Sequence, residues 1–241
     1  MNILGKALFY APELDSSEVT LSEEESRHCI SSLRLREGEV IFLTDGKGTL
    51  LEAKITKAHP KATEVKEMRR EKEEKQGRER RLVVAPPKAG ERLDWLVEKA
   101  VEIGVDEVLF IETRYSERDK VNLDRMQKIA IAAMKQSKQL YLPELFGVMR
   151  WKQFLEKEWL GTKLLAHIPS EGKVVPLLKD KLQGLRGTEG VTVLIGPEGD
   201  FTEEEIRQAL EKKFEPVSLG ASILRTETAV IYSLVCINAF A

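Results

Sequence analysis

The sequence has few cysteines, few histidines and no long apolar run. Its two cysteines, Cys29 and Cys236, are too few for a disulfide framework, so a reducing compartment is the simplest setting. The three histidines are scattered without metal-ligand spacing, and we expect no metal site. The longest apolar run, 229–237, is too short for a bilayer, and residues 1–14 lack the regions of a signal peptide. We therefore expect a soluble, cytoplasmic protein without membrane contact.

The common catalytic motifs are missing too. There is no Gly-x-x-x-x-Gly-Lys-Ser/Thr loop, no Gly-x-Gly-x-x-Gly after a strand, and no Gly-x-Ser-x-Gly elbow. His28 adjoins Cys29, but a core or surface position suits that pair better than a nucleophile. The net charge of −2 provides no global positive field for nucleic acid, although a local basic face would be enough.

Composition divides the chain near Gln76-Gly77 into a small module, 1–74, and a larger domain, 75–241. In the first part, Ser22 and Glu25 form a capping box for a helix that reaches about Leu33. Asp45-Gly46-Lys47-Gly48 joins two strand-forming runs as a hairpin. A few short strands around one helix predict a small β-barrel, with strands expected at 8–10, 39–44, 49–58 and 62–68.

From residue 82 onward, short buried strands alternate with helical apolar stripes, which predicts an α/β domain with a mostly parallel sheet. One stripe runs from Leu93 to Val101, and Gly104 closes its helix. Thr202 and Glu205 form a second capping box. Strands are expected at 82–85, 105–111, 163–168 and 191–195, and further helices from 123, 151, 175, 202 and 226.

A highly charged run, 66–81, contains eight basic and five acidic residues. One interpretation is a solvated linker or an exposed strand end, which is the usual role of such runs. The other is a phosphate-contacting surface formed by its arginines. Those arginines are Arg69, Arg70, Arg78, Arg80 and Arg81.

Two glycine-containing loops near the end of the chain are the strongest candidates for a binding site. Gly196-Pro197-Glu198-Gly199 follows a buried strand, and a loop with Gly220 precedes the last helix. Glycines let the backbone approach a ligand, and helix starts present free N–H groups. The pair predicts one small-molecule pocket walled by main chain, with ordinary strand-to-helix turns as the alternative. The loop 113–120 also follows a parallel strand, and its Arg114 and Arg118 are candidates to meet an anion.

Over essentially its whole length, the chain resembles the RsmE family of 16S ribosomal RNA uridine-N3 methyltransferases, within the SPOUT superfamily of knotted methyltransferases. Each matching motif is weak alone, but their order and spacing are specific. The residues that carry the resemblance are His28, Leu33-Arg34, Gly38, 98–105, 116–118, 136–137, 142–143, 195–199, 219–220 and 223–229.

The resemblance implies an N-terminal PUA-like β-barrel that binds RNA and a C-terminal SPOUT domain with a parallel sheet and a deep trefoil knot. It also implies a homodimer whose pockets are completed at the subunit interface, with 16S rRNA of the small ribosomal subunit as substrate. Val230, Leu234 and Ile237, if exposed on the last helix, would be consistent with a dimer. S-adenosylmethionine is the implied cofactor, held by Leu165, Ala166, His167, Ile195, Gly196, Pro197, Glu198, Gly199, Leu219, Gly220, Ile223, Leu224 and Thr226.

Three side chains are candidates for the chemistry. Negative charge that develops on the uracil carbonyl oxygens needs a cation, and we expect Arg118 from the partner subunit, or Arg225. Glu198 is either the proton acceptor or a group that holds a loop, and Glu227 caps the last helix or orients Arg225.

The sequence departs from the family pattern at three places. Asp200 follows Gly199 where the family often has glycine, and Lys138-Gln139 stands where many members have Gly-Arg. The arginine usual before the aromatic pair Phe9-Tyr10 is absent. We therefore expect RNA contacts from other basic residues: Arg27, Arg34, Arg36, Arg69 and Arg70, with Lys6 as a further candidate. Another SPOUT target RNA, or a non-catalytic RNA-binding role, is the alternative function.

Overall fold

A computed structural model describes residues 3, 5–75, 77–168, 174–185 and 189–240. Its contacts divide the chain into two compact units. The first consists of 1–76 together with 131–142, and the second of 77–130 together with 143–241. Gln76, next to the expected domain boundary, lies outside the described residues. The segment 131–142 comes from the middle of the chain, and its place in the first unit has a physical reason given below.

The first unit is built on a five-stranded sheet with the order β1-β3-β4-β5-β2. β1 and β3 are parallel, and the other neighbours are antiparallel. The four predicted strands are confirmed, β5 runs further than expected, and β2 was not predicted. The bounds are β1 Leu8–Tyr10, β2 Glu18–Thr20, β3 Val40–Thr44, β4 Thr49–Lys57 and β5 Glu64–Lys72.

The predicted helix of the first unit is an α-helical turn followed by a π-helical turn. Ser22 caps α1 (Glu23–Arg27) by accepting a hydrogen bond from the Glu25 N–H at 3.3 Å. The π-helix η1 (His28–Ser32) ends at Leu33, whose N–H donates to the His28 carbonyl. This helical segment buries Cys29 in the core of the sheet.

Both faces of the sheet are buried at residues 41–44 of β3 and 49–51 of β4, which explains the apolar runs there, whereas the second half of β4 alternates between buried and exposed residues. Ile41 and Leu43 point into the main core of the first unit, with Leu51 from β4. Phe42 and Leu50 point to the opposite face, as alternation along a strand requires. Leu140 packs on that second face, so 131–142 belongs to the first unit because it covers apolar strand residues.

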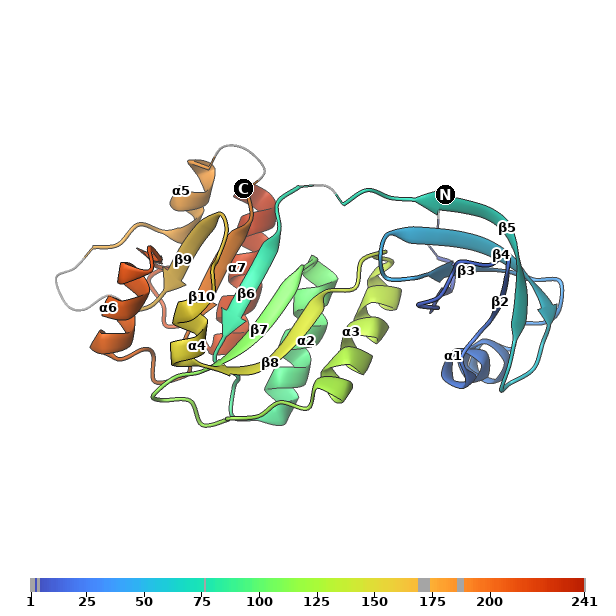
Figure 1. Cartoon of the computed structure of the whole chain (residues 1–241), viewed down its shortest axis with the longest axis horizontal. Coiled ribbons are helices and arrows are strands. Elements are labelled where there is room, and N and C mark those ends of the chain that lie inside the picture. Colours follow the sequence, from blue (N-terminus) through green and yellow to red (C-terminus); the bar gives the residue numbers. More distant parts are fainter. Residues whose placement is uncertain (1–2, 4, 76, 169–173, 186–188, 241) are drawn as a thin grey trace. The chain divides into compact units, whose positions relative to one another are not determined.

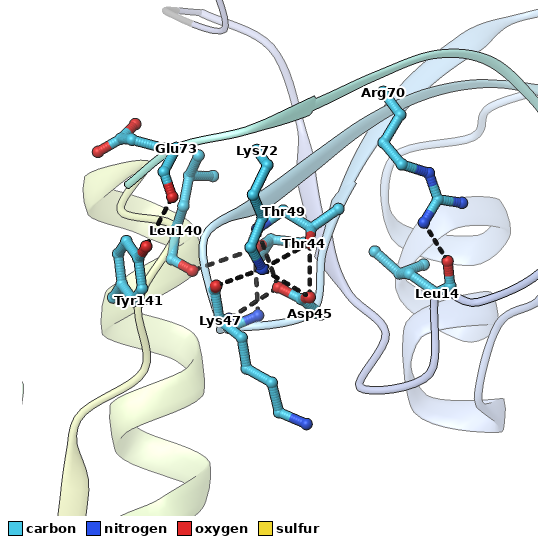
Figure 2. A network of polar contacts seen from close by, with 11 residues as sticks. Leu14, Thr44, Asp45, Lys47, Thr49, Arg70, Lys72, Glu73, Leu140 and Tyr141 are labelled. Atoms are coloured by element: carbon cyan, nitrogen blue, oxygen red, sulfur yellow. Dashed lines mark hydrogen bonds and ion pairs between the residues drawn. The ribbon is translucent and has the colours of Figure 1, made fainter. Parts of the chain in front are cut away.

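The β3–β4 hairpin is held by the carboxylate of Asp45 (Figure 2). This carboxylate accepts hydrogen bonds from the N–H groups of Lys47 and Thr49 at 2.7 and 3.0 Å, and from the Thr49 hydroxyl at 2.6 Å. Lys72 of β5 donates to the Lys47 carbonyl at 2.6 Å. Although burial opposes ionisation, the hydrogen bonds from Thr49 and Lys47 hold the pKa of Asp45 below its usual value.

Tyr141 closes the other side of the hairpin (Figure 2). Its hydroxyl donates to the Glu73 carbonyl at 2.6 Å, and the Gly48 N–H donates to the Leu140 carbonyl at 2.9 Å. Gly48 has a φ of +92°, and a Cβ there would collide with the Tyr141 hydroxyl and the Glu73 carbonyl. A glycine is therefore required where residues 140–141 meet the hairpin.

The charged run 66–81 is divided between two strands. Its first part lies in β5, where Arg69 pairs with Glu71 at 2.6 Å and Arg70 with Glu67 at 2.7 Å. Its end forms the start of β6 (Arg80–Val84), where Arg80 pairs with Asp106 at 3.0 Å. Arg81 is only 8% exposed, so it does not belong to a phosphate-contacting surface. The expectation of an exposed strand end is correct for β5.

The second unit is a parallel six-stranded sheet with the order β11-β9-β10-β6-β7-β8. The predicted α/β domain with a parallel sheet is confirmed, whereas β8 and β11 were not predicted. The remaining bounds are α2 Gly90–Ile103, β7 Glu107–Glu112, α3 Leu123–Ser137, β8 Glu144–Arg150, α4 Trp151–Glu156, β9 Thr162–Ala166, α5 Leu178–Gln183, β10 Val191–Ile195, α6 Glu203–Glu211, β11 Glu215–Val217 and α7 Thr226–Phe240.

Helices cover both faces of this sheet (Figure 1). α4 and α6 pack on one face, where Phe154 is fully buried among the rings of Trp151, Trp159 and Phe214 at centroid distances of 5.2–5.6 Å. α7 packs on the other face against β6, β10 and α2. Gly104 ends α2 with a φ of +98°, as the sequence predicts.

The last helix is apolar because it is buried within its own unit. Val230 and Leu234 are fully buried and Ile237 is 2% exposed, so the expectation that they form an exposed face is wrong. The physical reason is that α7 packs against the sheet and against its neighbours α2 and α5. Val235, at 50% exposure, is the large aliphatic residue of α7 that faces outward.

Replacing Asp45 by Asn is expected to lower the free energy of unfolding by about 1–3 kcal/mol at pH 7, because hydrogen bonds to a charged acceptor are replaced by weaker ones. The folded-state pKa of Asp45 is lowered, so its stabilisation exists above the unfolded pKa of about 3.9 and is lost as pH falls through the folded value. Urea unfolding of both proteins between pH 7 and pH 3 should show the difference shrinking. Exposed Glu13→Gln is the control, and a pH-independent difference would contradict the charge argument.

Candidate functional site

Three strands of the second unit end in register at one edge of the sheet. Ala166 at the end of β9 pairs with Ile195 at the end of β10 and with Val217 at the end of β11. Because all three strands are parallel, the segments that follow them leave from the same edge. This brings together the segments after residues 166, 195 and 217, which are far apart in the sequence.

These three segments line a cavity of ≈ 300 Å³. Both glycine loops contribute to it, as predicted, and Thr226 and Ala229 of α7 complete its wall. All predicted cofactor residues except Leu165 and Gly199 line the cavity. The lining residues are Ala166, His167, Ile168, Ile195, Gly196, Pro197, Glu198, Asp200, Ser218, Leu219, Gly220, Ala221, Ser222, Ile223, Leu224, Thr226 and Ala229.

Leu165 and Gly199 face away from the cavity for different reasons. Leu165 is fully buried in the core beneath α4 and α6, because it points to the face opposite Ala166. Gly199 lies against the loop after β7, where a Cβ would come 3.1 Å from the Cβ of Tyr115. The strand period predicts the position of Leu165, whereas the contact of Gly199 depends on the fold.

Two glycines of the site are required by geometry. At Gly196, a Cβ would meet the ring of Phe201 at 2.9 Å, so the β10 loop packs on that ring only without a side chain. At Gly220, φ is +131°, a conformation that L side chains rarely adopt, and a Cβ would meet no atom within 4 Å. Gly220 is exposed and leaves its backbone uncovered, whereas Gly196 is buried and allows the β10 loop to pack closely.

A hydrogen bond joins the start of α7 to the β10 loop. The hydroxyl of Thr226, 3% exposed, donates to the Gly196 carbonyl at 3.1 Å. α6 is fixed by the predicted capping box, since Thr202 and Glu205 exchange hydrogen bonds. Glu205 also accepts from the Arg114 N–H at 2.8 Å, which attaches the loop after β7 to the same helix.

Arg92, in the first turn of α2, lies between two carboxylates of the site. It is 3.8 Å from Glu198 and 3.7 Å from Glu227. Glu227 is 8% exposed, and its Oε2 is buried without a hydrogen-bond partner among the described residues. Glu227 was expected to cap the last helix or to orient Arg225, but Arg92 is the arginine that pairs with it in the described part of the chain. A local motif cannot reveal this contact, because α2 lies far from both acids in the sequence.

The three residues predicted for the chemistry differ in whether they line the cavity. Glu198 lines it, and Arg225 is an exposed residue between the lining residues Leu224 and Thr226. Arg118 does not line it; its guanidinium donates to the carbonyls of Pro87 and Lys88 at 3.2 and 2.6 Å. Within one chain, only Glu198 of these three contributes to the wall of the cavity.

Asp200 was not predicted to be part of the site. It ends the turn after β10, where its N–H donates to the Pro197 carbonyl, and its φ is +59°. Its carboxylate accepts a hydrogen bond from the Ile168 N–H at 2.9 Å, which joins the β9 and β10 segments. Lys138, a second departure from the family pattern, has a φ of +62°. Both residues stand in the left-handed region, where glycine avoids the strain of a side chain.

The predicted RNA contacts lie in the first unit, where a hollow of ≈ 600 Å³ includes Arg27, His28, Lys135 and Lys138 in its wall. Burial lowers the pKa of Lys138. Arg34 and Arg36 are exposed but do not line this hollow, and Arg69 and Arg70 carry the ion pairs of β5.

Other kinds of site find no support in the described residues. Cys29 is fully buried, and burial together with nearby Glu39 and Glu25 raises the pKa of its thiol to about 11, so a core position is confirmed. His, Cys, Asp and Glu side chains form no cluster that could hold a metal in the described part of the chain. None of the described helices combines the length and the hydropathy that a bilayer span requires.

Comparisons with known proteins agree on one family. A model of an RNA methyltransferase domain matches residues 73–238, and a model of an RNA methyltransferase PUA domain matches 21–68. A probable rRNA-methyltransferase structure from Porphyromonas gingivalis has a TM-score of 0.88 and 37% identity, covering 97% of this chain and 98% of that one.

Two further relatives carry more specific names. A structure of ribosomal RNA small subunit methyltransferase E from Neisseria gonorrhoeae, bound to S-adenosyl methionine, has a TM-score of 0.82 and 28% identity over 97% of both chains. A ribosomal RNA small subunit methyltransferase E from Synechocystis is 29% identical over 98% of this chain and 78% of its own length.

Replacing Thr226 by Val is expected to lower the free energy of unfolding by about 1–3 kcal/mol, because the buried Gly196 carbonyl loses its donor while the shape of the side chain is kept. Thr226→Ser retains the hydroxyl and is the matched control, with a smaller loss from the missing methyl group. Urea unfolding monitored by tryptophan fluorescence measures both. Equal losses in the two variants would mean that packing, rather than the hydrogen bond, matters at this position.

Proposed function

The chain belongs to the RNA methyltransferase family, and from this premise we propose that it transfers a methyl group from S-adenosylmethionine to N3 of one uridine in 16S rRNA of the small ribosomal subunit. The observation that carries the proposal is the cavity at the in-register ends of β9, β10 and β11. It lies where a family member would hold its cofactor according to the sequence motifs.

The residues present fit this cofactor. The volume of ≈ 300 Å³ is at the lower end of small-molecule pockets, and the apolar side chains in the wall suit the faces of an adenine. The exposed backbone at Gly220 offers polar groups without a side chain in the way. The acids in the wall, Glu198 and Asp200, are opposite in charge to a sulfonium and an ammonium group. When bound, the cofactor supplies an electrophilic methyl group.

The protein must present an unusual nucleophile to that methyl group. N3 of uracil carries a proton at neutral pH and is normally engaged in base pairing, so the base must be unpaired and turned into the site. Glu198, in the wall of the cavity, is the candidate that accepts the proton. Arg92 holds this carboxylate in place by its ion pair at 3.8 Å.

Loss of the N3 proton spreads negative charge onto the two flanking carbonyl oxygens, which a positioned arginine stabilises. Arg225 borders the cavity of its own chain, whereas Arg118 requires the cavity of a second copy, because its own chain keeps it away from the wall. A homodimer in which Arg118 enters the partner's site is therefore part of the proposal. The exposed side chains of Ile223 and Val235 support an interface near the site and along α7.

The first unit is proposed to dock the RNA. The match to an RNA methyltransferase PUA domain and the basic hollow around Arg27 and Lys138 support this assignment. Phosphate contacts position a nucleic acid without reading its sequence, so the choice of uridine falls to the cavity and to the fold of the RNA.

The decisive experiment is methyl transfer from labelled S-adenosylmethionine to small ribosomal subunits that lack the modification, with mass spectrometry of the nucleosides. We expect N3-methyluridine at a single position. A methylated ribose or another base would redirect the proposal to another RNA target of the same fold. Cofactor binding without transfer to any RNA would favour a non-catalytic RNA-binding role.

Replacing Arg118 by Ala is expected to lower the rate of methyl transfer by roughly 10²-fold, the cost of removing one stabilising donor, while the cofactor affinity stays nearly unchanged. Single-turnover transfer and calorimetric cofactor binding measure the two quantities separately. Arg207→Ala is the control, because this arginine is exposed on α6 and pairs only with residues of its own helix in the described structure. Equal loss of rate and affinity would assign Arg118 to cofactor binding or folding.

A further inference from the structure

We propose that Asp200 makes the cavity selective for the charged sulfonium form of the cofactor over the uncharged thioether that remains after transfer. This inference rests on the proposed use of S-adenosylmethionine. It concerns a specificity-determining residue that the motifs do not include.

The charged side chains that line the cavity are all negative. Of its lining residues, Glu198 and Asp200 are acidic and none is a lysine or an arginine. The negative charge of Glu198 is partly compensated by the guanidinium of Arg92, which lies 3.8 Å away. For Asp200, by contrast, no lysine or arginine of the described residues lies within ion-pair distance. Asp200 is therefore the less compensated negative charge in the wall.

The carboxylate of Asp200 is held in a fixed position. Its Oδ2 accepts from the Ile168 N–H and its Oδ1 from the Phe201 N–H, both at 2.9 Å. The residue has a left-handed backbone with a φ of +59°, a conformation that Asp and Asn adopt more readily than other residues with a side chain. A carboxylate anchored by two backbone N–H groups cannot turn away from the cavity without breaking both hydrogen bonds.

The cofactor and its product differ in charge at one atom. Both carry an ammonium and a carboxylate group, but the sulfur is a cation before transfer and a neutral thioether afterwards. A fixed negative charge in a small, partly enclosed cavity attracts the sulfonium and gains nothing from the thioether. The attraction ends when the methyl group leaves, so the product is released more readily than the cofactor.

The test compares three ligands that are similar in shape but differ in the charge at the centre of the molecule. S-adenosylmethionine and sinefungin carry a positive charge at the centre of the molecule, and S-adenosylhomocysteine has the same two ends without it. Calorimetric titrations at 50 and 300 mM salt would measure the three dissociation constants for the full chain. Asp200→Asn keeps one oxygen that can accept from the Ile168 N–H and tolerates a left-handed backbone, so it removes the charge and only the acceptor of the Phe201 N–H. Asp200→Gly removes the charge and both hydrogen bonds.

We expect Asp200→Asn to weaken binding of the two cationic ligands by about tenfold, with S-adenosylhomocysteine changed by about twofold or less. Asp200→Gly should lose the same selectivity and weaken all three ligands further, because Ile168 loses its acceptor. Glu203→Gln, exposed at the start of α6 and outside the cavity wall, changes the net charge equally and should preserve the selectivity.

Equal weakening of all three ligands in Asp200→Asn would overturn the inference and leave Asp200 as a positioning residue for the loop. Unchanged affinities would overturn it as well, without affecting the proposed function. Failure of the wild-type protein to bind any of the three ligands would overturn the proposed function together with the inference.

Discussion

The structure of the site depends on the parallel register of β9, β10 and β11. Because Ala166, Ile195 and Val217 are aligned across the sheet, the three segments that follow are forced to one edge. No side chain has to draw these segments together, since the backbone hydrogen bonds of the sheet already do so. The cavity is thus a consequence of pairing, and the polar contacts around it, such as that between Thr226 and Gly196, refine its wall.

Two glycines and one aspartate shape the backbone of the cavity wall in different ways. Gly196 allows the β10 loop to pack on Phe201, and Gly220 allows a backbone that few residues adopt. Asp200 also stands in the left-handed region but carries a side chain, which joins the β9 and β10 segments through the Ile168 N–H. A glycine at this position would relax the backbone and lose both the hydrogen bond and the charge. The left-handed backbone at Asp200 is therefore occupied by a side chain that joins two segments of the site.

Several features could be read from local sequence because their causes are local. The Asp45–Gly48 hairpin, the capping box of Thr202 and Glu205, and the end of α2 at Gly104 each depend on a few neighbouring residues. Other features depend on packing between distant parts of the chain, and there the expectations from sequence were wrong. The apolar face of α7 is covered by its own unit, and residues 131–142 leave the second unit because Leu140 covers strands of the first.

By itself, the sequence determined the class of fold and the two glycine loops, since periodicity and turn chemistry act over short distances. The resemblance to a known family supplied most of the residues that line the cavity. Only the tertiary structure decided that Arg92 joins Glu198 to Glu227 and that Asp200 belongs to the wall. These outcomes depend on sheet register and on helices that meet from distant parts of the chain. A one-residue change of register would turn different side chains toward the site, and no local pattern specifies it.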